Sequence, residues 1–416
     1  MDQVPEINNG LHGAALLNDP GRNKGTAFTL EERRALGLEG LLPSSPESLQ
    51  RQVERVLGHL DVKPNDLERY VYLIGLADRN ETLLYATVMS DPARFIPILY
   101  DPTVAEACLT FGHIYRRARG MYITRHMKGR MAEVLRNWPE RDIRFICVST
   151  GGRILGLGDI GANGMGIPIG KLQLYTACAA VPPNCLLPVL FDIGTTNDVL
   201  RADPLYLGLR EKPPSEAELD VLTEEFVQAV QEVFPGCCIH FEDWKGTDAI
   251  RMLDRYKDKV LCYNDDIQGT ASIVLAGLTT ALQIIDALLT EQRILFLGAG
   301  SAGIGIANLI VSAMQMKGLT KEAAQSRISL FDLNGLLEPS RTDLTAAQKP
   351  YAHKAQPSKD LVKTIEALKP TILVGVSTKG GAFTQQVVEA MSRINERPII
   401  FALSNPTDKA ECSAEH

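Results

Sequence analysis

The spacing of apolar and polar residues predicts helices at the start of the chain and short buried strands further on. In the first hundred or so residues, segments 49–60 and 67–89 carry apolar stripes at helical spacing between charged positions. From about Met121 to Asp265, helices mix with short apolar runs that end in polar or glycine-rich loops, which is typical of buried strands. These runs are RFICVST, LLPVLFDI and CCIHFED.

The last third of the chain alternates regularly between strand-like and helix-like segments. A long apolar helix is predicted at 271–289, and four strand candidates follow: RILFLGAG, RISLFDL, PTILVGVST and RPIIFALSNPT. This alternation is typical of a parallel, doubly wound sheet. We therefore expect an α/β protein of three parts. These are a helical N-terminal region that mediates oligomerisation (1–118), a mixed α/β catalytic domain (119–265) and a Rossmann-like doubly wound parallel sheet (266–416).

One uncharged stretch, Ile294 to Met316, is long enough to cross a bilayer. Glycines interrupt it at its centre, so a strand, a turn and a helix explain it better. We expect no membrane span.

Composition narrows the function classes. The chain has a formal net charge of -7 and a pI near 5.6, which argues against a nucleic-acid or anionic-membrane partner. The eight cysteines form no CxxC pair, and no Cys/His cluster suggests zinc. The first ten residues lack the features of a secretory or transit signal. We expect a cytoplasmic protein with reduced thiols.

The segment GAGSAGIG, residues 298–305, satisfies the GxGxxG dinucleotide fingerprint between a strand and a helix. Gly298 permits the tight turn, Gly300 admits a pyrophosphate, and Gly303 allows the helix to pack closely on the strand. Ser301 and Ala302 complete the predicted cofactor loop. The next predicted strand ends at Asp332, where a carboxylate would bind a ribose 2′-hydroxyl. No cation follows directly in Leu333-Asn334, so NAD is favoured over NADP.

Three acids form the second candidate constellation. Glu242 and Asp243 follow an apolar run, and Asp266 lies in NDDIQGT further along. Clustered carboxylates repel one another, and a hard divalent cation such as Mg²⁺ or Mn²⁺ removes that penalty. The alternative is that each acid caps a helix or lies in a solvated loop, although one acid suffices as a cap.

Three further residues are ambiguous when taken singly. Lys171 precedes a predicted helix and could act as a base, yet lysines in a first helical turn are usually solvated. Tyr100, read as a tyrosine at a strand end, is more often a packing residue. Arg153 could clamp a carboxylate, although a lone arginine is more often structural.

Together, many segments in order resemble the malic enzyme family across nearly the whole chain. They include LNDPGRNKGTAFTLEERRALGLEGLLP, DRNETLLY, YDPTVAEAC, RRARGMYIT, RILGLGDIGANGMGIPIGKLQLYTAC, PVLFDIGTTNDVL, DPLYLGLR, FEDW, NDDIQGTAS, GAGSAGIG and FALSNPT. The family it resembles oxidatively decarboxylates L-malate to pyruvate and CO₂, using NAD(P)⁺ and Mn²⁺ or Mg²⁺.

The resemblance also implies a role for each matching residue. Glu242, Asp243 and Asp266 match the metal ligands, Lys171 the general base and Tyr100 the general acid. Asp265 matches an acid associated with the lysine. Arg153 matches the residue that binds the substrate carboxylate near the nicotinamide, and Asn405 a contact to substrate and cofactor.

The chain also departs from the family pattern. Thr150 and Gly152 stand where the family usually has an aspartate and a glutamate, which could alter the support of Arg153. The sequence ends at His416, before a second substrate-binding asparagine expected in the family, so we expect a C-terminal truncation. Arg55 and Arg79 match two fumarate-binding arginines of some animal members, but Ser45 replaces an expected lysine, which favours ordinary ion pairing.

Two alternatives remain open. Malolactic enzyme is a relative that converts malate to lactate, although that branch typically has glycine where this chain has Arg153. A non-catalytic nucleotide-binding fragment is the other, and the early end of the chain is its support. The family usually forms dimers or tetramers, so we expect a homodimer or homotetramer that contacts its copies through the helical N-terminal region.

Overall fold

The computed structural model describes residues 10–154, 156–405 and 407–415. The chain forms two compact units. The first comprises residues 1–152 and 159–239, and the second comprises 153–158 and 240–416.

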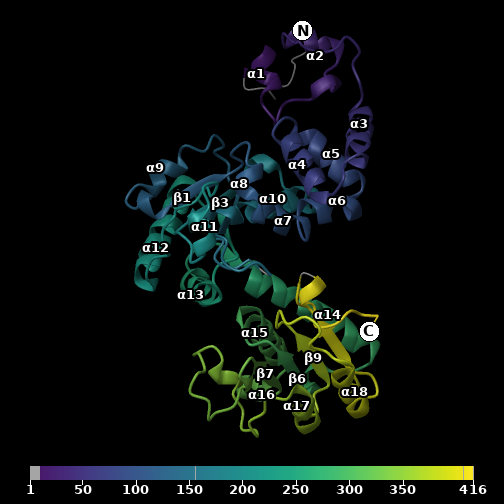
Figure 1. Cartoon of the computed structure of the whole chain (residues 1–416), viewed down its shortest axis with the longest axis vertical. Helices are drawn as coiled ribbons and strands as arrows, with labels where there is room; N and C mark the ends of the chain where they lie inside the picture. The colour runs from purple at the N-terminus through teal and green to yellow at the C-terminus, as the bar shows by residue number, and fades with distance from the viewer. Residues whose placement is uncertain (1–9, 155, 406, 416) are drawn as a thin grey trace. The chain divides into compact units, whose positions relative to one another are not determined.

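The first unit begins with helices, as the apolar stripes predict (Figure 1). These are α1 (Gly13–Leu17), α2 (Leu30–Ala35), α3 (Leu49–Asp61), α4 (Asp66–Ala77), α5 (Glu81–Ser90), α6 (Pro92–Leu99), α7 (Thr103–Leu109) and α8 (Phe111–Ile114). The starts of α3, α4 and α5 are fixed by Ser48, Asn65 and Asn80, whose side chains each accept a hydrogen bond from a backbone N–H of the first turn.

A five-stranded sheet follows, in the order β1-β3-β2-β4-β5. Its strands are β1 (Met121–Thr124), β2 (Phe145–Ser149), β3 (Leu186–Asp192), β4 (Cys238–Glu242) and β5 (Cys262–Asn264). Strands β1, β2 and β3 belong to the first unit, β5 belongs to the second, and the boundary at residues 239–240 falls within β4. β3 pairs in parallel with both β1 and β2. The three apolar runs predicted as strands are β2, β3 and β4, whereas β1 and β5 are additional. The helices here are α9 (Met131–Leu135), α10 (Gly166–Ala179), α11 (Asp198–Ala202) and α12 (Glu216–Val233).

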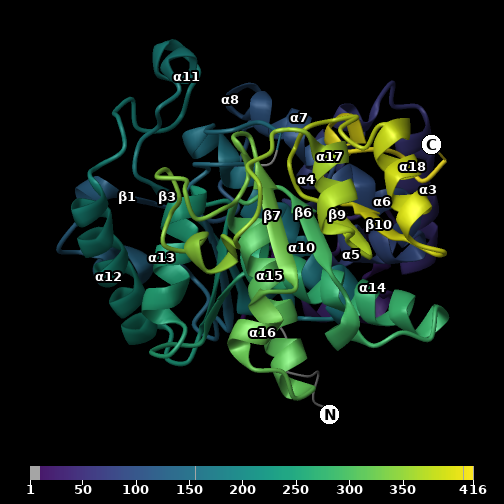
Figure 2. The same ribbon diagram turned by 90° about the horizontal axis from the view of Figure 1, so that it is seen from below.

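The second unit contains another five-stranded sheet, in the order β10-β9-β6-β7-β8 (Figure 2). β6 (Ile294–Leu297), β7 (Ile328–Asp332), β9 (Ile372–Gly375) and β10 (Ile399–Ala402) are the four predicted strands. Their pairings are parallel, and the short β8 (Gly335–Leu336) adds an antiparallel edge. The helices are α13 (Gly246–Tyr256), α14 (Thr270–Ile284), α15 (Ser301–Met316), α16 (Lys321–Gln325), α17 (Leu361–Leu368) and α18 (Gln385–Ile394).

Both faces of this second sheet are buried. Phe296, with its neighbours on one face, packs into a core that includes residues of α14 and α15. Leu295 and Leu297 point the other way, into a core that includes residues of α17 and α18. Successive side chains of a strand point to opposite faces, so this division confirms the doubly wound α/β arrangement.

The uncharged stretch 294–316 is a strand, a turn and a helix, as expected: β6 and α15. A different helix, Asp265–Ile284, consists of α14 and the helical turn that precedes it. It is long and apolar enough to cross a membrane when judged by length and composition alone. Its buried residues Ala271, Val274, Leu278 and Leu282 follow helical spacing and belong to the core of the second unit.

We predict that Gly303→Ala destabilises the second unit. A Cβ at this position would lie 2.4 Å from the carbonyl oxygen of Gly298, so the helix would have to move off the strand. We expect a loss of about 1–3 kcal/mol, measured by thermal denaturation. The matched control is Gly300→Ala in the same loop, where a Cβ would meet open space. Equal losses for the two variants would contradict this account.

Candidate functional site

The acids Glu242 and Asp243 stand at the end of β4 and are both buried, with 4% and 6% of their surfaces exposed. Asp243 has a positive φ of 54°, a strained conformation for a residue other than glycine. The backbone therefore turns sharply directly after Glu242. Burying two adjacent carboxylates costs free energy unless they are paired or bind a cation.

The segment Asn264-Asp265-Asp266 lies against this turn. The Oδ2 atom of Asp266 accepts a hydrogen bond from the backbone N–H of Asp243 at 2.9 Å. Asn264 caps the turn that follows, since its Oδ1 accepts from the backbone N–H of Ile267 at 3.0 Å. The cap is thus an amide side chain, and neither Asp265 nor Asp266 is needed for it.

A histidine joins the acids. Ligand atoms of His240, Glu242 and Asp265 all lie within 4.8 Å of one another. Within this group, the distance from His240 Nε2 to Glu242 Oε2 is 2.6 Å. The structure therefore groups Glu242 with Asp265 and an unpredicted imidazole, while Asp266 contacts the backbone of Asp243.

The glycine loop has the conformation that the fingerprint requires. Gly298 has a φ of 122°, and a Cβ there would lie 2.4 Å from the carbonyl oxygen of Val376. Gly300 precedes α15 and faces open space, so the start of the helix is open to a ligand. Gly303 lies tightly on Gly298, as described above. Ser301 and Ala302 form the first turn of α15.

Two contacts bring the acidic segments and the glycine loop together. A Cβ at Gly246 would lie 3.4 Å from the Ser301 hydroxyl and 3.9 Å from a guanidinium nitrogen of Arg153. A Cβ at Gly305 would lie 2.8 Å from the carbonyl oxygen of Ile267. The loop after β4 thus lies beside Arg153 and the fingerprint, and the turn containing Asp266 packs directly on α15.

Asp332 ends β7, as predicted, but it has a cationic partner that the adjacent sequence does not contain. Both of its carboxylate oxygens accept hydrogen bonds from Arg341 at 2.8 Å. Arg341 also donates to Asp343 at 2.6 Å. Hydrogen bonds to Asp343 and then Asp332 raise the pKa of Arg341, and Arg341 lowers the pKa of Asp343. Leu333-Asn334 supplies no cation, as the sequence indicates, but the loop that follows brings Arg341 to Asp332.

Asn405 is exposed and follows β10. The loop that carries it is held by Glu411, which is fully buried. Its carboxylate accepts from the backbone N–H and hydroxyl of Ser377 at 2.9 and 2.8 Å. It also accepts from the Ser404 hydroxyl at 2.7 Å and the Ser404 N–H at 3.3 Å. Glu411 thus ties together the loops after β9 and β10.

Tyr100 and Lys171 lie together within the first unit. The Lys171 ammonium is 4.9 Å from the centre of the Tyr100 ring. Two local predictions are wrong here. Tyr100 ends helix α6 instead of a strand, because Asp91 caps that helix and Pro92 fits its first position. Lys171 lies inside α10, which begins at Gly166, because Pro168 is tolerated in a first turn.

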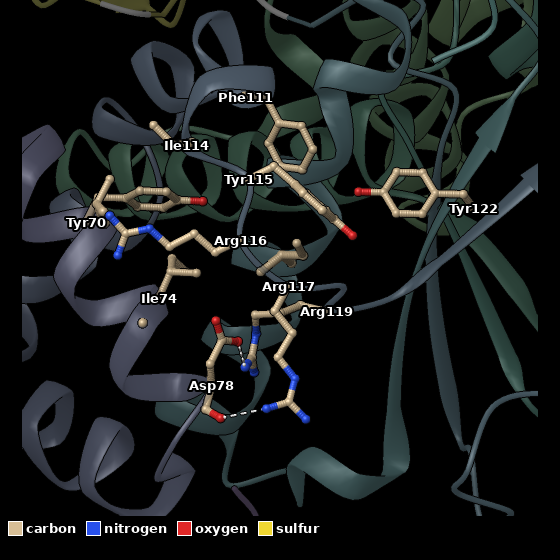
Figure 3. Close-up of a pocket in the computed structure, with 13 residues that line it drawn as sticks. Tyr70, Ile74, Asp78, Phe111, Ile114, Tyr115, Arg116, Arg117, Arg119 and Tyr122 are labelled. Atoms are coloured by element: carbon tan, nitrogen blue, oxygen red, sulfur yellow. Dashed lines mark hydrogen bonds and ion pairs between the residues drawn. The ribbon is translucent and has the colours of Figure 1, made fainter. Parts of the chain in front are cut away.

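A hollow that opens to solvent lies in the first unit, and its volume is about 510 Å³ when the solvent at its open side is included (Figure 3). Its lining comes from α4, α8, β1, the segment between α8 and β1, and Ile169 of α10, and it includes no predicted site residue. Arg119 donates to Asp78 at 3.0 Å and to Glu81 at 2.8 Å. Burial lowers the pKa of Arg119, but Glu81 and Asp78 outweigh that effect and raise it overall.

The two proposed fumarate arginines make ordinary contacts. Arg55 forms an ion pair with Glu47, and the Arg79 Nε donates to the carbonyl oxygen of Gly75 at 2.9 Å.

The doubly wound sheet and its glycine turn place the second unit in the class of dinucleotide-binding folds. Comparison with known families identifies the chain more closely. Residues 77–257 match the malic enzyme N-terminal domain, and residues 267–416 match the malic enzyme NAD-binding domain. The chain belongs to the malic enzyme family.

Curated relatives agree with this assignment. NADP-dependent malic enzyme of Columba livia is 49% identical over 97% of this chain and 72% of its own length. The mitochondrial NAD-dependent malic enzyme of Ascaris suum is 46% identical over 97% of this chain and 63% of its own length. A crystal structure of Entamoeba histolytica malic enzyme shares the fold, with a TM-score of 0.50, 22% identity, and coverage of 90% of this chain and 67% of that one.

Three residues near the predicted site were missed in the sequence: His240, Arg341 and Glu411. His240 could have been noticed, because it lies two residues before Glu242 and therefore faces the same side of the strand. Arg341 and Glu411 reach their partners through irregular loops, and no periodic pattern marks such contacts.

We predict that Glu411→Ala destabilises the second unit by about 4 kcal/mol or more, because the four donors of Ser377 and Ser404 lose a shared acceptor at ~1–3 kcal/mol each. Chemical denaturation followed by circular dichroism measures this loss. Glu415→Ala is the control, since Glu415 is exposed near the same end of the chain. If both variants unfold at the same denaturant concentration, Glu411 does not hold the two loops.

Proposed function

We propose that this protein catalyses the oxidative decarboxylation of L-malate to pyruvate and CO₂, with reduction of NAD(P)⁺ and dependence on Mn²⁺ or Mg²⁺. The observation that carries the proposal is the position of the buried acids. The buried Glu242 and Asp243 lie on a turn beside Arg153, and the half-buried Asp266 lies on a second turn that packs on the fingerprint helix α15. Family membership and the names of the relatives supply the reaction.

The residues present fit a divalent cation. Glu242 and Asp243 are buried carboxylates on adjacent positions, and oxygen donors of this kind suit Mg²⁺ and Mn²⁺. Glu242, Asp243 and Asp266 would hold the ion, as the resemblance implies. A bound cation supplies a Lewis acid that lowers the pKa of the C2 hydroxyl of malate.

The remaining roles fall to side chains that move protons or orient the substrate. Lys171 takes the proton from the C2 hydroxyl, with Asp265 as its associated acid. Tyr100 gives a proton to C3 after CO₂ has left. The close approach of Lys171 and Tyr100 supports their action as an acid–base pair.

Arg153 and Asn405 each bind the substrate and the cofactor. Arg153 makes charge-assisted hydrogen bonds through its guanidinium, and Asn405 makes hydrogen bonds through its side-chain amide. Gly298, Gly300, Ser301, Ala302 and Gly303 receive the pyrophosphate at the start of α15.

NAD is the cofactor that the local charges favour. Asp332, Arg341 and Asp343 form one hydrogen-bonded group with two negative charges and one positive charge. This net charge disfavours a 2′-phosphate, whereas the Asp332 carboxylate can accept a hydrogen bond from a ribose 2′-hydroxyl. The relatives include both NADP-dependent and NAD-dependent enzymes.

We further propose where the protein acts, how its copies assemble and how its binding residues are divided along the chain. The protein acts in the cytoplasm as a homodimer or homotetramer, and the helices of residues 1–118 contact the other copies. The malate-binding and metal-binding residues lie largely in 119–265, and the NAD(P)-binding residues in 266–416. Several large apolar side chains of residues 1–118 are exposed, among them Leu30, Val62, Met89 and Leu109, and burial of such side chains against another copy would be favourable.

We predict that the protein with malate, NAD⁺ and Mn²⁺ forms pyruvate and NADH in equal amounts. Lys171→Ala should lower kcat about 10²–10⁴-fold, because the base is removed. Absorbance at the NADH band and an enzymatic pyruvate assay measure both products. Lys128→Ala is the control, since Lys128 is an exposed lysine of the same unit. Lactate without net NADH would identify malolactic activity instead, and nucleotide binding without turnover would indicate a non-catalytic protein.

We predict that Asp332→Asn raises the ratio of kcat/KM for NADP⁺ to that for NAD⁺ by about 10-fold, corresponding to ~1.4 kcal/mol. The substitution removes one negative charge and leaves Arg341 to attract a 2′-phosphate. Initial rates with each cofactor give the ratio. Asp254→Asn is the control, because this acid pairs with Lys257 on α13. An unchanged ratio would show that Asp332 does not distinguish a ribose 2′-hydroxyl from a 2′-phosphate.

A further inference from the structure

His240 is a fully buried histidine on β4, and it faces one of the proposed metal ligands. It lies two residues before Glu242, so both side chains point to the same face of the strand. The His240 Nε2 atom is 2.6 Å from the Oε2 atom of Glu242. An ionised carboxylate can only accept hydrogen bonds, so we assign His240 the tautomer in which Nε2–H donates a hydrogen bond to Glu242.

A second aromatic residue fixes the plane of this imidazole. The ring of Tyr263, on β5, stacks on the ring of His240, with the centroids 4.5 Å apart and an angle of 21° between the ring planes. Tyr263 is followed directly by Asn264 and Asp265. The strand that orients the histidine is thus the strand that delivers Asp265 to within 4.8 Å of the same group.

The hydrogen bond from His240 to Glu242 indicates that the Nε2 atom is a donor to the carboxylate and not a metal ligand. A protonated Nε2 has no lone pair to offer a cation, so the nitrogen that faces Glu242 is a donor to the carboxylate. A hydrogen bond to one oxygen restricts the rotation of a carboxylate and so favours particular directions for its other oxygen. Partners of this kind commonly orient the ligands of a metal ion and tune their affinity.

We propose that His240 is a positioning residue that orients the Glu242 carboxylate for binding of a divalent cation. The hydrogen bond from Nε2 sets the carboxylate, and Tyr263 sets the imidazole. This inference rests on the proposed function only in taking Glu242 as a metal ligand.

The affinity for Mn²⁺ tests the inference without requiring turnover. The free Mn²⁺ signal in electron paramagnetic resonance falls as the ion binds, and gives Kd for the full chain. His240→Phe keeps an aromatic ring against Tyr263 but removes the donor, and we expect Kd to rise about 10–100-fold. His240→Gln restores an N–H donor and should recover most of the affinity. Should Phe prevent folding, His240→Leu takes its place.

His353→Phe is the matched control in the same unit, because the His353 Nε2 contacts backbone oxygens of Gln325 and Ile328 instead of a carboxylate. Its Kd should equal that of the wild type. Far-ultraviolet circular dichroism without metal confirms that each variant is folded.

Two variants distinguish failure of the proposed metal site from failure of the positioning role of His240 alone. If Glu242→Gln binds Mn²⁺ as tightly as the wild type, the proposed metal site fails, and the role of His240 fails with it. If Glu242→Gln weakens binding but His240→Phe does not, the positioning role alone is overturned. A nitrogen coupling in pulsed electron paramagnetic resonance, of the size given by a directly bound imidazole, would also overturn it, because His240 would then be a ligand.

Discussion

The burial of negative charge at the end of β4 is the constraint on which the rest of the site depends. Glu242 and Asp243 are both nearly inaccessible to solvent. Buried carboxylates are stable only when hydrogen bonds or cations replace the water they lose. The backbone makes a strained turn at Asp243, and the backbone N–H of Asp243 donates a hydrogen bond to the carboxylate of Asp266. The turn therefore joins two acidic segments that are separated in the sequence.

This requirement also explains why the acids and the fingerprint occur together. The Asp266 turn continues into α14, and Ile267 in that turn packs on Gly305 of α15 so closely that a side chain at Gly305 would collide with it. Helix α15 begins at the glycine loop, so its position is coupled to that of the acidic turn. An acidic cluster and a dinucleotide fingerprint held by one close helix contact form a single rigid part of the second unit.

The sequence was sufficient for the elements that repeat a simple pattern. β6, β7, β9 and β10 are short apolar runs between helices, and each was predicted at its place. Tyr100 and Lys171 show where pattern fails: proline and glycine suggested a loop or a strand end, but both residues lie at or in helices whose first turns accept proline. Short β1 and β5 were missed for a related reason, since four and three residues carry little periodicity. Arg341 shows a further limit, because its approach to Asp332 depends on the path of a loop.

Three acids of the second unit are stabilised in chemically different ways, and the difference bears on function. Asp332 is matched by the full positive charge of Arg341, which limits what a further cation could gain there. Glu411 is matched by hydroxyl and backbone donors of Ser377 and Ser404, which suits a fixed structural tie between loops. Glu242 receives a hydrogen bond from an imidazole that need not carry a charge. Neutral donors orient the carboxylates of both Glu411 and Glu242 without cancelling their negative charge. Of these two acids, Glu242 is the one that lies in a cluster of possible metal ligands, with Asp265 and His240.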